Sequence, residues 1–238
     1  MTHIATHGCA PRTIVVAAHG THDPAGIAVA HQLVDALRAR LPGSSVLLGF
    51  VDVLGPGVRE VVASAPGLVT VVPTFLTSGY HVRVDVPRAV AATQRNDVTI
   101  SAALGPHPLL VAAMGERLRE AGWQRGDAVV LAAAGSSDPR AVADVRAAAC
   151  LLSAQVGRRV RVGFVATGAP RVAPLVAGLR AAGESRVAIA SWLLAPGLFS
   201  HRLDTAEADV VAAPLGVHPR VVDRLVQLAN VGTALRSA

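Results

Sequence analysis

Two histidines stand where imidazole chemistry could take place. His19 opens the run His-Gly-Thr-His-Asp-Pro, and His81 closes the later segment Ser-Gly-Tyr-His. Neutral imidazole is a common ligand for borderline divalent metal ions, and it also exchanges a proton near neutral pH. A histidine at the end of a strand can equally be a polar residue bonded to backbone. We interpret the two together as a pair that handles a divalent metal ion.

The chain contains an internal sequence duplication. VVAAHGTHDP at residues 15–24 is matched by VLAAAGSSDP at residues 130–139. Further matches follow in the same order at a nearly constant offset, ending with Leu-Gly-Pro-His-Pro at 104–108 and Leu-Gly-Val-His-Pro at 215–219. Such ordered self-similarity is the signature of a duplicated domain.

Comparison of the two copies distinguishes the two histidines from the residues around them. The second copy keeps the Gly-x-x-Asp-Pro turn, but Ala134 stands in place of His19, and Phe199 or Ser200 stands in place of His81. Residues kept in both copies are expected to shape the turns, and residues of one copy are expected to carry function. The sequence therefore predicts one active centre.

Buried strands alternate with helical patterns in each copy. We expect strands at 13–18, 45–51, 68–72 and 97–101, and again near 128–133, 159–165, 186–192 and 209–212. Continuous Val, Ile and Leu runs between amphipathic helices are typical of parallel sheets. We predict two doubly wound, Rossmann-like α/β domains facing a central cleft, with a disordered leader at 1–12, one domain at 13–122 and its repeat at 123–238.

Ligands of open parallel sheets bind beyond the carboxyl ends of the strands. His19 follows the first predicted strand, Asp52 follows the second, and the segment 73–81 follows the third. Two such edges around one cleft suit a flat, sizeable ligand.

The remaining histidines and Asp85 have simpler interpretations. His107 and His218 recur beside proline at predicted helix starts, which indicates a structural role. His22 is matched by a serine and is either a turn residue or a further contributor to the site. His31 and His201 have no predicted role, although His201 could line the cleft. Asp85 precedes Val-Pro, so it either caps a helix or orients or deprotonates His81.

Composition excludes several classes of protein. The chain is 52% hydrophobic and 16% charged, and its net charge of +6 rests on scattered arginines, because it contains no lysine. Aromatic residues make up 3%, too few to stack on bases, so we expect no nucleic-acid partner. No apolar run is long enough to cross a membrane, and no secretory signal is visible, which favours the cytoplasm. Cys9 and Cys150 suggest neither a disulfide nor a thiolate metal site.

These motifs resemble a known family. His-Gly-x-x-Asp-Pro at 19–24, followed by Pro-x-Phe-Leu-x-x-Gly-x-His-x-x-x-Asp-Val-Pro at 73–87, is similar to the CbiX/SirB family of sirohydrochlorin chelatases in its long, two-domain form. The resemblance implies a chelatase-type fold and insertion of Fe²⁺ or Co²⁺ into sirohydrochlorin, for sirohaem or cobalamin synthesis. The metal ion is then a substrate, and no permanent cofactor is expected.

The resemblance also implies roles for individual residues. The catalytic histidine pair of the family maps onto His19 and His81, which would bind the metal, with Asp85 or an imidazole as the base. Carboxylates of the macrocycle would be held by arginines and by backbone N–H groups of the loops. The residues expected to bind substrate are Gly20, Ser78, Gly79, Arg83, Arg88, Ser136 and Arg202. Since duplication supplies both sides of the cleft, we expect a monomer.

Two other functions fit parts of the pattern. Histidine phosphatases also begin with a strand and a His-Gly turn, but they require an arginine where this chain has Ala18. A non-catalytic carrier of tetrapyrrole or metal would use the same cleft, and turnover of free metal and sirohydrochlorin would distinguish it from a chelatase.

Overall fold

The computed structural model describes residues 12–231. The predicted leader therefore lies outside the described residues, except for Arg12, which is the first residue of a strand.

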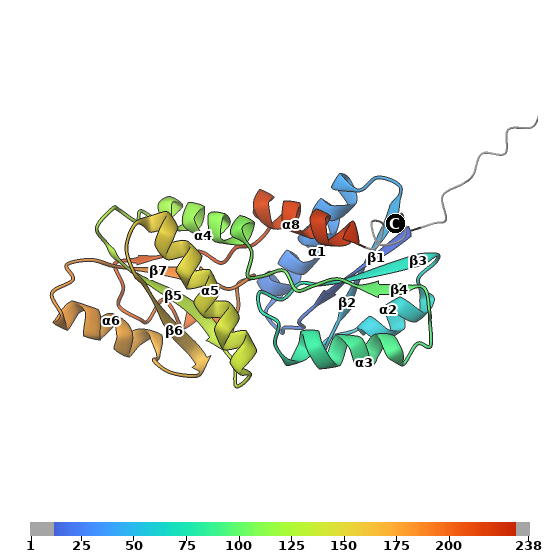
Figure 1. Cartoon of the computed structure of the whole chain (residues 1–238), viewed down its shortest axis with the longest axis horizontal. Helices are drawn as coiled ribbons and strands as arrows, with labels where there is room; N and C mark the ends of the chain where they lie inside the picture. Colours follow the sequence, from blue (N-terminus) through green and yellow to red (C-terminus); the bar gives the residue numbers. More distant parts are fainter. Residues whose placement is uncertain (1–11, 232–238) are drawn as a thin grey trace, which may run out of the picture.

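Two parallel four-stranded sheets form the framework (Figure 1). The first has the order β2-β1-β3-β4, and the second repeats it as β6-β5-β7-β8. The strands are β1 (Arg12–Ala18), β2 (Ser44–Phe50), β3 (Leu68–Pro73), β4 (Val98–Ile100), β5 (Ala128–Gly135), β6 (Val160–Thr167), β7 (Val187–Trp192) and β8 (Val210–Val211). Every pairing is parallel, which confirms the predicted pair of doubly wound sheets and all of the predicted strands.

Helices connect the strands at the predicted places. They are α1 (Pro24–Arg40), α2 (Val58–Ser64), α3 (Val86–Ala91), α4 (Pro108–Glu120), α5 (Pro139–Val156), α6 (Val172–Ala181), α7 (Leu198–His201) and α8 (Pro219–Ala229), and a π-helical turn, η1 (His81–Asp85), precedes α3. Asp23 and Asp138 cap α1 and α5, each accepting a hydrogen bond from the backbone N–H two residues on. Proline follows each cap, where a missing N–H costs nothing. Both caps belong to the Gly-x-x-Asp-Pro turn that the two copies share.

The last helix of each half packs on the other half. α4 follows the first sheet in sequence but packs against β7 and α5 of the second, and α8 packs against α1 and β3 of the first. Figure 1 shows this exchange, with α4 beside α5 and α8 beside α1. One hydrophobic core consequently runs through both halves, containing Ile14 and Leu37 from the first and Leu131 and Leu152 from the second. The two sequence repeats are thus interlocked in space.

Both recurring histidines are helix caps, as predicted. The Nδ1 of His107 accepts from the backbone N–H of Leu109 at 3.3 Å, and the Nδ1 of His218 accepts from that of Arg220 at 3.2 Å. His218 also contacts Glu116 on α4, with Nε2 and a carboxylate oxygen 2.9 Å apart, so it joins α8 to α4.

Within the described residues, no helix is long and apolar enough to cross a membrane.

Candidate metal centre

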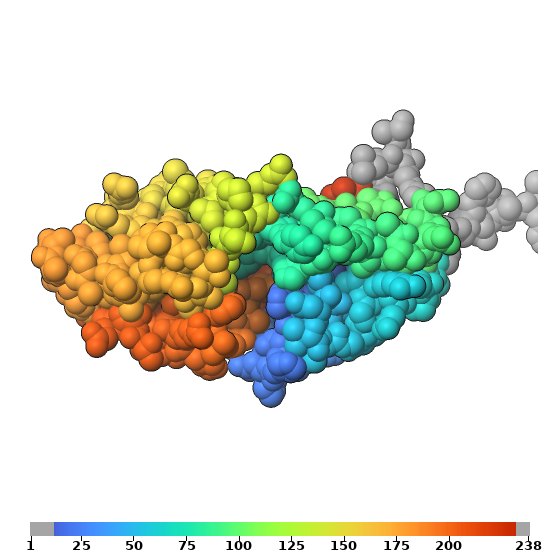
Figure 2. All heavy atoms as spheres, turned by 90° about the horizontal axis from the view of Figure 1, so that it is seen from below, coloured from blue at the N-terminus to red at the C-terminus, as the bar shows by residue number. Residues whose placement is uncertain are grey.

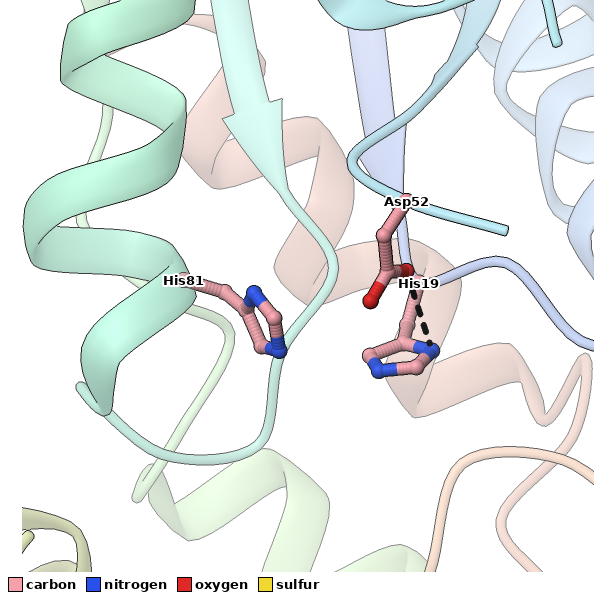
Figure 3. A group of neighbouring side chains, drawn as sticks. All are labelled: His19, Asp52 and His81. Carbon is pink, nitrogen blue, oxygen red and sulfur yellow. Dashed lines mark ion pairs between the residues drawn. The ribbon is translucent and has the colours of Figure 1, made fainter. Parts of the chain in front are cut away.

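Three side chains from neighbouring strand ends converge on one point (Figure 3). His19 follows β1, Asp52 follows β2, and His81 begins η1 after β3. One ligand atom from each lies within 4.8 Å of the others, a spacing that allows a single metal ion to bind all three. The imidazole rings of His19 and His81 lie 5.0 Å apart and nearly perpendicular, at 87°. Two imidazoles and a carboxylate form a donor set suited to Fe²⁺, Co²⁺ or Zn²⁺.

Hydrogen bonds present the same nitrogen of each imidazole to the centre. The Nδ1 of His19 lies 2.6 Å from the carbonyl oxygen of Gly20, and the Nδ1 of His81 lies 2.7 Å from the Oδ2 of Asp85. Both partners are acceptors, so Nδ1 carries the hydrogen in each neutral ring and Nε2 keeps its lone pair. A partner on the second nitrogen is the usual way in which proteins fix the tautomer and orientation of a metal-binding histidine.

Asp85 orients His81 and does not cap a helix. Its backbone is helical, with φ −71° and ψ −46°, and its side chain makes no capping hydrogen bond. The capping interpretation is therefore wrong, because the helical path begins earlier, at His81. Pro87 has no N–H for a regular α-helical bond, and the wide π turn, in which the N–H of Val86 donates to the carbonyl of His81, accommodates it.

A tight backbone contact positions Asp52. A Cβ atom at Gly20 would lie 2.0 Å from the carbonyl oxygen of Asp52, so only glycine fits there. The N–H of Gly20 also points toward the Oδ1 of Asp52, at 3.4 Å. The next residue, Val53, adopts φ +65°, which is costly for a β-branched side chain, and the N–H of Leu54 closes the turn on the carbonyl of Asp52 at 2.7 Å.

Phe75 packs on the histidine pair from the loop after β3. Its ring stacks on that of His81 at 5.6 Å and 26°, and it meets His19 edge-on at 6.3 Å. These ring contacts restrict the orientations that the two imidazoles can adopt.

His19 lines a recess between the two halves. Figure 2 shows the hollow where the halves meet. Its volume is about 240 Å³, and it is lined by His19, Phe75 and Leu76 from the first half and by Ser136, Val142 and Trp192 from the second. Ala134, the counterpart of His19, also lines it. All three metal-ligand candidates therefore lie on one side, as the duplication predicted for the histidines.

Hydrogen bonds across the recess hold the halves together. The backbone N–H of Ser78 donates to the Oδ2 of Asp144 at 2.7 Å, and Arg83 donates to the Oδ2 of Asp138 at 2.9 Å. The backbone N–H of Arg140, and then the guanidinium of Arg83, hold the pKa of Asp138 below its ordinary value. Gly79 lies beside Ala141 at the same contact.

The predicted substrate-binding residues fall into two groups. Ser136 lines the recess, Gly20 adjoins the histidines, and Ser78, Gly79 and Arg83 lie at the contact between the halves. Arg88 and Arg202 are exposed and outside the lining of the recess, so their role in binding carboxylates stays a prediction. His22 is exposed as well, and His201 lies 3.4 Å from Asp23, with Nε2 facing a carboxylate oxygen.

Asp52 is the site residue that the sequence analysis did not select. The signal was present: Gly-Phe-Val at 49–51 matches Gly-Phe-Val at 163–165, and the next residues are Asp52 and Ala166. The two histidines were selected because the second copy lacks them, and the same comparison of the two copies would have selected this carboxylate.

The fold and the site together define a class. Two interlocked α/β halves with a one-sided His–Asp–His centre form a chelatase-type protein. The chain belongs to the CbiX family, because the sequence model described as CbiX matches residues 13–121 and again residues 128–230. The two matches coincide with the two copies.

Solved structures share this fold. SirB from Bacillus subtilis with Fe³⁺ superposes with a TM-score of 0.82 at 20% identity, covering 95% of this chain and 97% of that one. The sirohydrochlorin chelatase SirB from B. subtilis subspecies spizizenii in complex with cobalt gives 0.76 at 19% identity, with the same coverage. DR2241 from Deinococcus radiodurans, a multi-domain protein with structural similarity to chelatases, gives 0.75 at 24% identity, covering 94% of this chain and 56% of that one. No curated protein sequence matches the chain.

Proposed function

We propose that this protein is a sirohydrochlorin chelatase that inserts Fe²⁺ or Co²⁺ into the macrocycle. The observation that carries the proposal is the convergence of His19, Asp52 and His81 at the edge of the recess. Membership of the CbiX family supports it, as does the likeness to SirB, whose structures hold iron or cobalt. The product would serve sirohaem or cobalamin synthesis. We further propose that the enzyme acts as a monomer in the cytoplasm.

The first step is capture of the metal substrate. The Nε2 atoms of the two imidazoles and one oxygen of Asp52 bind the ion, and its other positions stay open for water and then for pyrrolic nitrogen. A site with no thiolate holds the ion less tightly than a structural zinc site, which suits an ion that must be released. The side chains of His19 and Asp52 are 53% and 40% exposed, so the ion can enter from solvent.

The second step exchanges the metal ion for two protons. Insertion of a divalent ion removes two N–H protons from the macrocycle, and it frees the Nε2 atoms of His19 and His81. We infer that these two nitrogens accept the protons, so that two imidazolium ions replace the lost dication and the net charge of the site does not change. Asp52, with a carboxylate oxygen 3.5 Å from the Nδ1 of His19, and Asp85, 2.7 Å from that of His81, stabilise the two cations.

The test is metal insertion with the purified protein under anaerobic conditions. We expect the absorption spectrum of sirohydrochlorin to change faster with protein than without it, for Fe²⁺ or Co²⁺. His19→Ala and His81→Ala should each lower the rate by about 100-fold or more, a loss of roughly 3 kcal/mol of transition-state stabilisation. His22→Ala is the matched control and should leave the rate unchanged. No acceleration with Fe²⁺, Co²⁺ or Ni²⁺ would contradict the proposal.

A further inference from the structure

A second hollow lies on the edge of the second sheet. It has a volume of about 440 Å³ and shares no lining residue with the recess beside the histidines. Strand β6, the edge strand of that sheet, runs through it between α5 and α6 (Figure 1). We call it the β6 groove and define it by Arg146, Cys150 and Ser153 of α5 and by Arg159, Val160 and Arg161 at β6.

Three guanidinium groups of the β6 groove are available to a ligand. Within the described part of the chain, Arg146, Arg159 and Arg161 have neither an ion pair nor a side-chain hydrogen bond, and all three are exposed. No carboxylate lines the groove, and Val162 and Leu175 add apolar side chains to its lining. Several other arginines of the same half are paired, among them Arg158 with Glu184 and Arg180 with Asp209.

In the first copy, an arginine side chain occupies the position that corresponds to the β6 groove. Arg38, the counterpart of Ser153, donates to the backbone carbonyl of Val46 on the edge strand β2 and pairs with Asp35 at 2.9 Å. In the second copy that pair is replaced by Ser153 and Cys150, so both the filling side chain and the negative charge are gone.

The arginines of the groove belong to one copy only. The counterparts of Arg146, Arg159 and Arg161 in the first copy are His31, Ser45 and Leu47. The helix and the edge strand that frame the groove are present in both copies, while the three charges are present in one. The same one-copy asymmetry distinguishes the metal ligands from the residues that shape the turns.

We propose that the β6 groove binds a small organic polyanion, one that carries at least two carboxylate or phosphate groups on an apolar framework. Guanidinium groups bind both kinds of oxyanion through paired hydrogen bonds. The volume falls within the usual range of small-molecule sites, about 300–1,000 Å³. The apolar side chains in the lining, Val162 and Leu175, favour a ligand with an apolar body. The proposal does not depend on the chelatase activity.

Calorimetry with three probes tests the ligand chemistry. Naphthalene-1,4,5,8-tetracarboxylate represents carboxylates, naphthalene-1,5-diyl bisphosphate represents phosphates, and inorganic pyrophosphate lacks an apolar body. We expect at least one naphthalene probe to bind the full-length protein at least tenfold more tightly than pyrophosphate does. Which naphthalene probe binds identifies the anionic group. Undetectable binding of both at 1 mM, or tighter binding of pyrophosphate, would overturn the proposal.

Variants copied from the first half locate the ligand. Arg159→Ser with Arg161→Leu should weaken binding at least tenfold. Cys150→Asp with Ser153→Arg should do the same without changing the net charge, because it restores the pair that fills the first copy. Arg40→Ala with Arg119→Ala, which removes two exposed charges elsewhere, should have no effect. Equal weakening in the Arg159/Arg161 and Arg40/Arg119 variants would show a general charge effect and refute the site.

Protection of Cys150 gives a second, local measurement. The thiol is exposed and lines the groove. In a Cys9→Ser background, the bound naphthalene probe should slow alkylation of Cys150 by neutral iodoacetamide at least fivefold, and the Arg159/Arg161 variant should lose this protection. Unchanged alkylation at a saturating probe concentration would place the ligand elsewhere and contradict the proposal.

Discussion

The hydrogen bond between His81 and Asp85 fixes the orientation of one imidazole of the candidate metal centre. The 2.7 Å contact between Nδ1 and Oδ2 sets the tautomer, and the side chains of His81 and Asp85 are 35% and 27% exposed. Asp85→Asn keeps the shape of the side chain but replaces the charged acceptor. We expect the affinity for Co²⁺ to fall by about 10-fold or more, the usual effect of losing such a partner. Titration followed by visible spectroscopy measures it, and an unchanged affinity would show that Asp85 does not support the ligand.

His107 provides a pH test of stability that is separate from the metal site. Burial, and then the positive charge of Arg224, lower the pKa of His107 from its ordinary value of 6.5. The neutral ring is therefore favoured in the folded state. Its contribution to stability is complete above pH 6.5 and is lost as the pH falls from there through the lowered pKa.

The matched pair His107→Asn and His107→Ala tests this linkage. Asparagine caps helices without titrating in this range, so the Asn variant should lose less stability than the native protein between pH 7 and pH 5. The Ala variant should lose about 1 kcal/mol at pH 7 through loss of the cap, and both should keep metal insertion. Urea unfolding at each pH measures the difference. A pH dependence identical in the Asn variant and the native protein would contradict the assignment.

At the scale of elements, the exchanged helices make each half dependent on the other. In an isolated fragment of residues 1–122, α4 has no second sheet to cover, and the face of β1 and β3 that α8 covers is open. We expect this fragment to self-associate, because α4 of one copy can cover the sheet of another in the place of α8. Analytical ultracentrifugation of the fragment checks this. A folded, monomeric fragment would show that the exchange is not needed for stability.

Element patterns in the sequence predicted most of the fold. The continuous Val, Ile and Leu runs predicted every strand, because such runs are local signals. No local signal predicted the exchange of α4 and α8, since the pattern of apolar residues on a helix does not indicate which sheet that helix packs against. The π turn at His81 was missed because Val-Pro at 86–87 resembles an ordinary helix start. Asp52 could have been found, since Ala166 replaces it in the second copy.

At the scale of the whole molecule, the recess must enlarge for a macrocycle to enter. Its volume of about 240 Å³ is below the usual range for drug-sized ligands, about 300–1,000 Å³, and a tetrapyrrole is larger than most of those. The contacts from Ser78 to Asp144 and from Arg83 to Asp138 join the two halves. We therefore expect the two halves to separate at these contacts during each turnover.

A reversible crosslink tests this motion. A Cβ atom at position 79 would lie 3.6 Å from the Cβ of Ala141, within the range for a disulfide, about 3.5–4.5 Å. Gly79→Cys with Ala141→Cys, in a background with Cys9 and Cys150 replaced by serine, should stop insertion when oxidised and recover when reduced. Binding of Co²⁺ should survive oxidation. Full insertion activity in the oxidised protein would show that the halves need not separate.

The most direct test of the central claim is transfer of a single metal ion per chain. Protein loaded with one Co²⁺ under anaerobic conditions, freed of excess metal and mixed with sirohydrochlorin, should convert one equivalent of the macrocycle to its cobalt form. His19→Ala and His81→Ala, mixed with the same amount of Co²⁺, should convert it no faster than free metal does. Retention of the ion by the native protein, or equal transfer by the variants, would contradict the assignment of His19, Asp52 and His81 as the centre that delivers the metal.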